Sequence, residues 1–254
     1  MDPEQVHTLS AQLLAMADDE LLLGQRDSEW CGNAPIIEED IAFANLALDE
    51  LGHALVWYNL LAELVGEGST QDADRLVFFR EPQEFRNLQL VELPNGDWAF
   101  SMLRQFLFDS AEQVRLEALQ SSAYGPLAQA AAKLRPEEHY HYRHTHAWVL
   151  RLGQGTEESH RRMQAALDAI WPYTLQLFTP LPGASELAAA GIIPSADRLR
   201  SAWDALILPV LASSGLQIST GPQHQLERSQ HTPHLKALLA EMQSVAQLDR
   251  QAEW

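Results

Sequence analysis

Two Glu-x-x-His pairs are the residues of this sequence whose types and spacing could bind a metal ion. Glu50 precedes His53 by three positions, and Glu138 precedes His141 by three. A helix turns about 100° per residue, so side chains three positions apart project from one face and can offer an oxygen and a nitrogen to the same ion. The pattern indicates metal binding if both pairs lie on helices.

A single glutamate precedes each pair at a similar distance. Glu20 lies 30 residues before Glu50, and Glu112 lies 26 residues before Glu138. One Glu from each of two helices, with one Glu-x-x-His from each of two others, is the ligand set of the ferritin-like di-iron and di-manganese bundles. Asp109, one turn before Glu112, is an alternative ligand that the sequence leaves open. The predicted metal ligands are Glu20, Glu50, His53, Glu112, Glu138 and His141.

These polar residues fall on helical faces that are otherwise apolar. At the period of a helix, Glu50 and His53 share a stripe with Phe43, Leu46 and Trp57. Burying an unpaired carboxylate costs on the order of several kcal/mol. Two divalent ions would balance four carboxylates, so a di-iron centre accounts for both the number and the sign of these residues.

Two alternatives need no metal. The carboxylates could pair with histidines or arginines in a metal-free polar core, and Glu20 could belong to a solvated acidic run with Asp18 and Asp19. The arginines available for such pairing are Arg104, Arg115 and Arg143. The neighbouring His139, His144 and His146 are expected at the surface or behind the ligands.

Helical periodicity predicts the elements that position the ligands. Pro82 and Pro94 interrupt the region from 70 to 96, which is expected to be the long crossover of a ferritin-like bundle. Pro136 is expected to kink or split its helix. The predicted core bundle occupies about residues 3–153, with helices at about 3–26, 35–65, 97–122 and 126–152.

The remaining residues, about 156–254, are predicted to form an additional C-terminal helical extension that packs on the bundle. Alternating strand patterns of useful length are missing from the sequence. We therefore expect a single all-α, ferritin-like domain over residues 1–254, with helices at about 156–178, 195–211 and 231–248. Trp30, Trp203 or the segment after Thr156 is expected to offer apolar surface to a partner protein.

Composition limits the function further. The chain of 254 residues carries a formal charge of -18, which argues against nucleic acid and anionic membranes as partners. Neither a signal peptide nor a membrane span is apparent, so we expect a cytoplasmic protein. The single cysteine, Cys31, excludes an iron–sulfur cluster held by this chain alone, so redox chemistry would need electrons from a separate protein.

Four groups of segments together resemble a known family over nearly the whole chain. They are residues 24–26 with 29–35, 44–52, 85–87 with 91–96, and 231–235 with 239–243. The sequence resembles the PaaA/PaaC family of ring-1,2-phenylacetyl-CoA epoxidase subunits, most closely the C-type members. The resemblance implies a ferritin-like component of a multicomponent monooxygenase that forms a ring epoxide from phenylacetyl-CoA and O2.

The resemblance also implies partners and a division of labour. The catalytic di-iron site of the family belongs to the homologous A-type subunit, and the C-type member is its structural partner with degenerate ligand positions. Other epoxidase subunits, a separate reductase and the acyl-CoA substrate complete the implied complex, in which this chain is part of an oligomer. Because this sequence retains the complete ligand set, a metal-bearing di-iron oxygenase or oxidase in its own right is the alternative.

Overall fold

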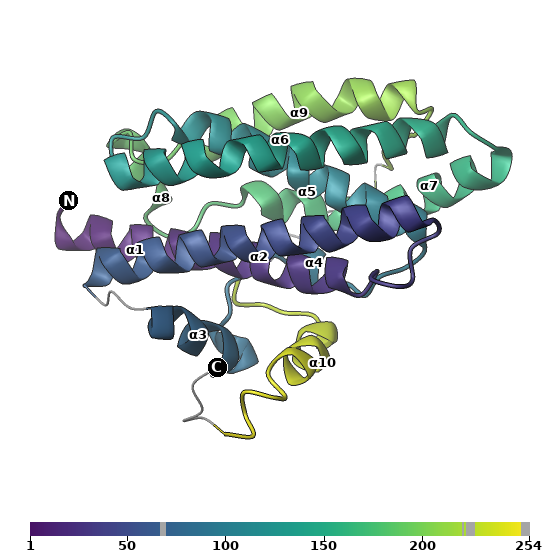
Figure 1. Ribbon diagram of the computed structural model, residues 1–254. Helices are drawn as coiled ribbons and strands as arrows, with labels where there is room; N and C mark the ends of the chain where they lie inside the picture. Colours follow the sequence, from purple (N-terminus) through teal and green to yellow (C-terminus); the bar gives the residue numbers. More distant parts are fainter. Residues whose placement is uncertain (67–69, 220, 222–226, 250–254) are drawn as a thin grey trace. The chain divides into compact units, whose positions relative to one another are not determined.

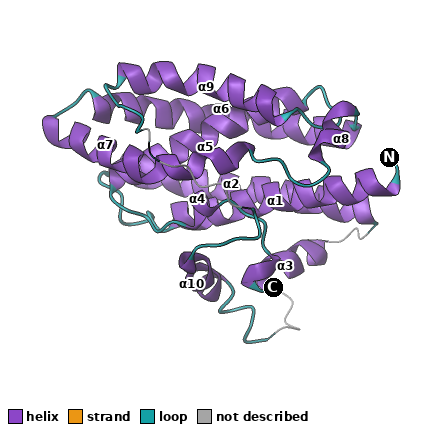
Figure 2. Cartoon of the chain, turned by 180° about the vertical axis from the view of Figure 1, so that it is seen from behind, coloured by secondary structure: helices purple, strands orange, loops and turns teal. Residues whose placement is uncertain are grey.

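Every regular element in the described part of the chain is a helix (Figures 1 and 2). The computed structural model describes residues 1–66, 70–219, 221 and 227–249. The predicted all-α class is confirmed. Residues 67–69, which follow the predicted helix at 35–65, and residues 220, 222–226 and 250–254 of the predicted extension lie outside the described residues.

The chain forms two compact units. Unit 1 contains residues 1–94 together with 227–254, and unit 2 contains residues 95–226. The predicted 156–254 extension is therefore divided between the two units. The single-domain assignment stays a prediction.

Unit 1 is built on an antiparallel helical hairpin of α1 (Pro3–Ser28) and α2 (Ile37–Val65) (Figure 1). Asp2 caps α1, since its carboxylate accepts a hydrogen bond from the backbone N–H of Gln5. α2 begins two residues after Pro35 and ends at Gly66, whose φ of 87° is the left-handed conformation of a helix C-cap.

The two helices approach most closely beside Gly24. A Cβ atom at this position would lie 3.1 Å from the carbonyl oxygen of Ala47 and 3.1 Å from Cβ of Glu50. Glycine therefore allows the backbones of α1 and α2 to come together beside one of the predicted metal ligands.

The predicted crossover contributes short helices to unit 1. α3 (Thr70–Phe78) packs on α2, and α4 (Gln89–Glu92) packs on α1. Between them lies a 3-10 turn, η1 (Pro82–Glu84). The C-terminal helix α10 (Pro233–Met242) is shorter than predicted and packs on α4 and η1.

Unit 2 is built on a second antiparallel hairpin, on which the following helices pack. Its helix α6 continues through Pro136, so the predicted split does not occur. Pro136 and Ala132 both lie on the exposed face, where water can bind the carbonyl group that proline leaves without a donor. The elements are α5 (Trp98–Leu119), α6 (Gly125–Gly153), α7 (Glu157–Ile170), η2 (Trp171–Phe178), α8 (Ala184–Ala189) and α9 (Ala196–Ser213).

Trp203 on α9 is part of the core of unit 2. Its indole N–H donates to the carbonyl oxygen of Leu107 at 3.1 Å, and its ring stacks on Trp171 with a centroid distance of 5.8 Å. The side chain is fully buried. The expectation that Trp203 offers surface to a partner is therefore wrong, because an indole inserted against α5 fills an internal space of this unit.

Candidate metal centre

Unit 1 brings three of the predicted ligands together. Glu20 projects from α1, and Glu50 and His53 project from α2. A carboxylate oxygen of each glutamate and a ring nitrogen of His53 all lie within 4.8 Å of one another. Each of the three residues is at most 2% exposed. The prediction that Glu20 lies in the apolar seam is confirmed, and the solvated acidic run is wrong.

The amphipathic pattern of α2 explains this placement. Phe43, Leu46 and Trp57 are fully buried on the same face as Glu50 and His53. The hydrophobic effect therefore orients the face, and the carboxylate and imidazole are carried inward with it. Desolvation of these polar groups costs free energy that a bound cation would offset.

The chemistry of this donor set fits a divalent transition metal. Two carboxylates balance two positive charges, and oxygen with imidazole nitrogen suits iron, manganese or zinc. A carboxylate oxygen and a ring nitrogen that bind one ion lie about 3 Å apart when metal–ligand bonds are about 2.1 Å. Nδ1 of His53 lies 4.0 Å from Oε2 of Glu50, so small side-chain rotations would close the set around one ion.

Unit 2 holds a second Glu-x-x-His pair on α6. Oε2 of Glu138 lies 3.6 Å from Nδ1 of His141, and both side chains are fully buried. This pair is arranged as the spacing predicts. Because the three ligands above belong to unit 1, convergence of all six residues on one centre stays a prediction.

Protein groups engage both candidate ligands of α5. Glu112 is buried and forms an ion pair with the guanidinium of Arg115. Asp109 accepts hydrogen bonds from Nε2 of Gln105 at 2.9 Å and from the hydroxyl of Thr145 at 2.8 Å. The alternative of arginine pairing therefore holds at Glu112. The positive charge beside Glu112 on α5 is therefore supplied by a protein side chain, the guanidinium of Arg115.

The other arginines and histidines have different surroundings. Arg143 is exposed, and Arg104 donates to the side-chain oxygen of Asn95. His139 is exposed, as expected. His146 packs against Tyr142 with a ring-centroid distance of 5.6 Å, and partial burial lowers the pKa of His146.

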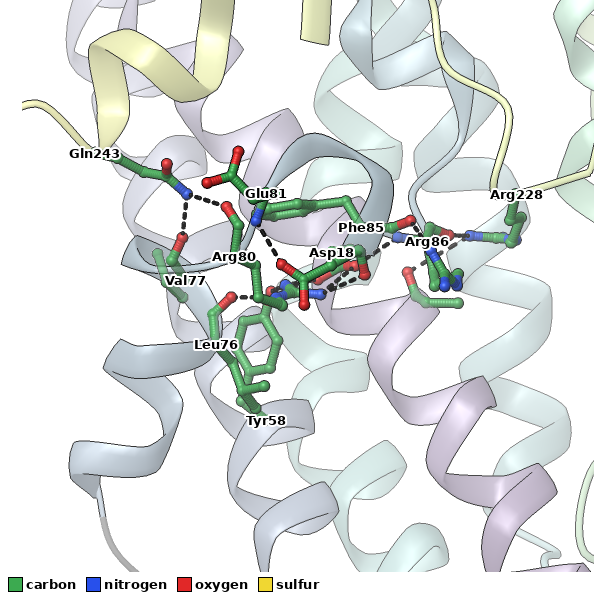
Figure 3. A network of polar contacts seen from close by, with 12 residues as sticks. Asp18, Tyr58, Leu76, Val77, Arg80, Glu81, Phe85, Arg86, Arg228 and Gln243 are labelled. Carbon is green, nitrogen blue, oxygen red and sulfur yellow. Dashed lines mark hydrogen bonds and ion pairs between the residues drawn. The ribbon is translucent and has the colours of Figure 1, made fainter. Parts of the chain in front are cut away.

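Sequence reasoning missed the role of Asp18. Its carboxylate accepts hydrogen bonds from the hydroxyl of Tyr58 at 2.6 Å and from the backbone N–H of Arg86 at 2.7 Å (Figure 3). It also forms a buried ion pair with Arg80, whose guanidinium lies 4.0 Å from the centroid of the Phe85 ring. Burial, followed by the negative charge of Asp18, raises the pKa of Tyr58 well above its ordinary value.

Asp19 continues this polar network toward the C-terminal segment. It accepts from the backbone N–H of Leu88 at 2.7 Å and from Nη1 of Arg228 at 2.7 Å. The sequence does contain a signal for this network, which is the run of three consecutive acids in α1. Consecutive side chains point in different directions around a helix, so a helix with one solvent-exposed face cannot expose all three.

Glu92 makes a second connection to the C-terminal segment. Its carboxylate oxygens lie 2.6 Å from Nδ1 of His231 and 2.6 Å from the backbone N–H of Thr232, and Nδ2 of Asn87 donates to it at 2.9 Å. Two groups of segments that carry the family resemblance, 85–87 with 91–96 and 231–235 with 239–243, therefore meet through Glu92, His231 and Thr232.

Comparison with known proteins identifies a family and two relatives that this chain resembles. The family model of the phenylacetic acid catabolic proteins matches residues 1–254. The C-type subunit of the 1,2-phenylacetyl-CoA epoxidase of Escherichia coli is 37% identical over 254 residues, which covers 98% of this chain and 100% of that relative. The A-type subunit of the same epoxidase is 27% identical over 173 residues, which covers 68% of this chain and 54% of that relative.

The match to both epoxidase components is in keeping with a helical scaffold that the two share. Members of this family are ferritin-like helical proteins, in agreement with the predicted fold class and with the helices described above. The chain belongs to the phenylacetic acid catabolic protein family.

Proposed function

We propose that this chain is the C-type subunit of a phenylacetyl-CoA epoxidase that acts in phenylacetate catabolism. The observation that carries the proposal is the 37% identity to the C-type component of such an epoxidase, which extends over the whole of that relative. A coenzyme A thioester as the substrate of the complex is consistent with a cytoplasmic location. Among the described helices, none has the length and hydropathy that a membrane span requires.

In this proposal the chain does not itself turn over substrate and supports a homologous, catalytic A-type subunit. The surroundings of α5 favour this role. A working di-iron centre needs a free carboxylate from this helix, whereas Glu112 pairs with Arg115 and both oxygens of Asp109 accept hydrogen bonds.

We further propose that Glu20, Glu50 and His53 bind one divalent cation. Their close approach and burial within unit 1 support this assignment. Iron at such a site would supply redox chemistry with O2, using electrons from a separate reductase. If Glu138 and His141 complete the set, the centre would be a di-iron site.

The alternative is an oxygenase or oxidase that acts without an A-type partner. It is favoured by the retention of all six ligand types, but it requires Glu112 to exchange Arg115 for a metal ion. Arg115→Met tests this alternative directly, because removal of the guanidinium should raise metal content if a second ion competes with it.

Reconstitution tests the main proposal. The chain should copurify with a coexpressed A-type partner, and the pair should epoxidise phenylacetyl-CoA when O2 and an electron-donating reductase are supplied. The chain alone should give no product. Product formation by the chain alone would support the alternative, and failure of a folded A-type partner to associate would contradict a C-type role.

A further inference from the structure

The outer face of α2 carries a line of exposed apolar side chains. Ile37, Ile41, Leu48, Leu51 and Leu55 are between 37% and 67% exposed. We name these five residues the α2 stripe. An exposed leucine alone is ordinary, but apolar side chains gathered along one helix face mark an interaction surface.

The spacing of the stripe is that of a coiled-coil seam. With Ala44 included, which is partly exposed, successive positions from 37 to 55 are separated by 4, 3, 4, 3 and 4 residues. This alternation keeps side chains on one line along a helix and allows another helix to pack against it. The line extends over 18 residues, or about 27 Å of helix.

The stripe is distinct from the buried face of α2. Glu50 and His53 project inward with Leu46 and Trp57, whereas Leu48 and Leu55 project outward. α2 is therefore apolar on two opposite faces. The inner face packs within the protein, and the outer face is exposed in the place where a solvated helix carries polar residues.

The charges beside the stripe indicate the chemistry of its partner. α2 contains neither lysine nor arginine, and the acids of α2 that adjoin a stripe residue in sequence and are not buried are Glu38, Asp40 and Asp49. A second copy of this chain would place acidic residues against acidic residues, and each chain carries a formal charge of -18. A helix flanked by lysine or arginine would complement the stripe in both hydrophobicity and charge.

We propose that the α2 stripe is the docking surface for a helix of a different chain, one that carries apolar residues at the same spacing and basic residues beside them. The inference names the surface at which the proposed C-type subunit would contact another chain. It rests on the proposed function only for the expectation that the partner is a different chain. Hydrophobic contact supplies affinity, and the acidic residues beside the stripe, Glu38, Asp40 and Asp49, disfavour self-association.

A designed peptide provides the first test. The probe is a helix of about 20 residues, enough to span about 30 Å, with leucine at the seam positions and lysine beside them. The matched control peptide has glutamate in place of lysine. The lysine peptide should bind the wild-type chain in buffer of moderate salt, and the glutamate peptide should bind at least about tenfold more weakly.

The double variant Leu48→Asp/Leu55→Asp separates docking from general electrostatic attraction. It makes the protein more acidic, so nonspecific attraction to the lysine peptide would increase, whereas seam docking should weaken at least about tenfold. Val245→Asp, at another exposed apolar residue, is the matched control and should bind as the wild type does. Equal or tighter binding by the double variant would overturn the proposal.

Sedimentation and copurification complete the experiment. A wild-type dimer that the double variant abolishes would make a second copy the occupant and would overturn the proposal. If the A-type partner copurifies equally with the wild type and the double variant, the inference fails while the proposed function stands. If the wild type never associates with that partner but binds the lysine peptide through the stripe, the proposed function fails and the inference stands.

Discussion

Three consecutive acids of α1 have three different surroundings. Asp18 pairs with Arg80, Asp19 binds Arg228, and Glu20 lies against Glu50 and His53. The first two carboxylates are neutralised by protein cations. Glu20 lies with a second carboxylate and an imidazole, and the close approach of these three donor groups is the physical basis for placing a metal ion there.

Removal of Glu50 should lower metal content. Glu50→Ala leaves two ligands of the unit 1 set, so bound metal per chain should fall at least about threefold in protein purified from iron-replete cells. Elemental analysis by mass spectrometry measures this. Glu38→Ala removes an exposed acid from the first turn of the same helix and should keep the wild-type content. A wild-type chain without metal would contradict the assignment.

Tyr58 should make stability depend on alkaline pH. Its raised pKa means that the folded protein holds the phenolic proton when the unfolded chain, with a pKa of about 10, has lost it. The stabilising contribution is complete below pH of about 10 and is lost as pH rises toward the folded-state pKa. Tyr58→Phe cannot ionise, so its unfolding free energy in urea should fall less between pH of about 9 and 11.

The matched reference for that measurement is Tyr140→Phe, at an exposed tyrosine. This variant should show the same alkaline loss as the wild type. If both variants lose stability equally with pH, the raised pKa of Tyr58 does not contribute. Tyr58→Phe should also be less stable near neutral pH by about 1 to 3 kcal/mol, because Asp18 loses a buried donor.

At the scale of elements, the contact between α1 and α2 depends on glycine at one position and not at another. Gly24 and Gly52 both lie inside helices. A Cβ at Gly24 would approach Ala47 and Glu50, whereas a Cβ at Gly52 would meet no atom within 4 Å. Replacing glycine with alanine would raise helix propensity at both positions, so the two positions differ only in the packing around the new Cβ atom.

Alanine substitution at the two glycines should therefore have opposite effects. Gly52→Ala should stabilise by up to about 1 kcal/mol through helix propensity. Gly24→Ala should lose that gain to overpacking, which costs about 1 to 3 kcal/mol. Chemical denaturation of the two variants measures the difference, and equal stabilisation by both would show that α1 and α2 can separate without cost.

For the whole molecule, the C-terminal segment is held by unit 1 through polar contacts distant in sequence. His231 lies between the carboxylate of Glu92 and the carbonyl oxygen of Phe85. Gln243 donates to the carbonyl oxygens of Val77 and Arg80 (Figure 3). These contacts join residues 231–243 to residues 77–92 within unit 1.

His231→Ala should loosen this segment locally. Glu92 is fully buried, so loss of its partner should make backbone amides of α10 exchange hydrogen at least about tenfold faster, which corresponds to about 1.4 kcal/mol. Amides of α5 and α6 should exchange at wild-type rates. The control His234→Ala replaces an exposed histidine of α10. Equal acceleration in both variants would exclude a specific role for His231.

The sequence by itself determined the helices and the candidate ligands. Periodicity placed α1, α2, α5 and α6 within a few residues of their ends, because an amphipathic helix repeats its apolar residues at a fixed angular interval. The same periodicity put Glu20, Glu50 and His53 on buried faces, and the structure brings these three together. Local spacing is sufficient for residues that share a helix or a hairpin.

Only the tertiary structure decided which charges meet across the chain. Arg115 pairs with Glu112 at a spacing of three residues on one helix, which the sequence itself shows, whereas charges far apart in the chain have no such spacing. Asp19 meets Arg228 more than 200 residues later, and Glu92 meets His231. Such pairs carry no periodic signal, since they form only after the apolar faces of the helices have packed and brought distant segments together.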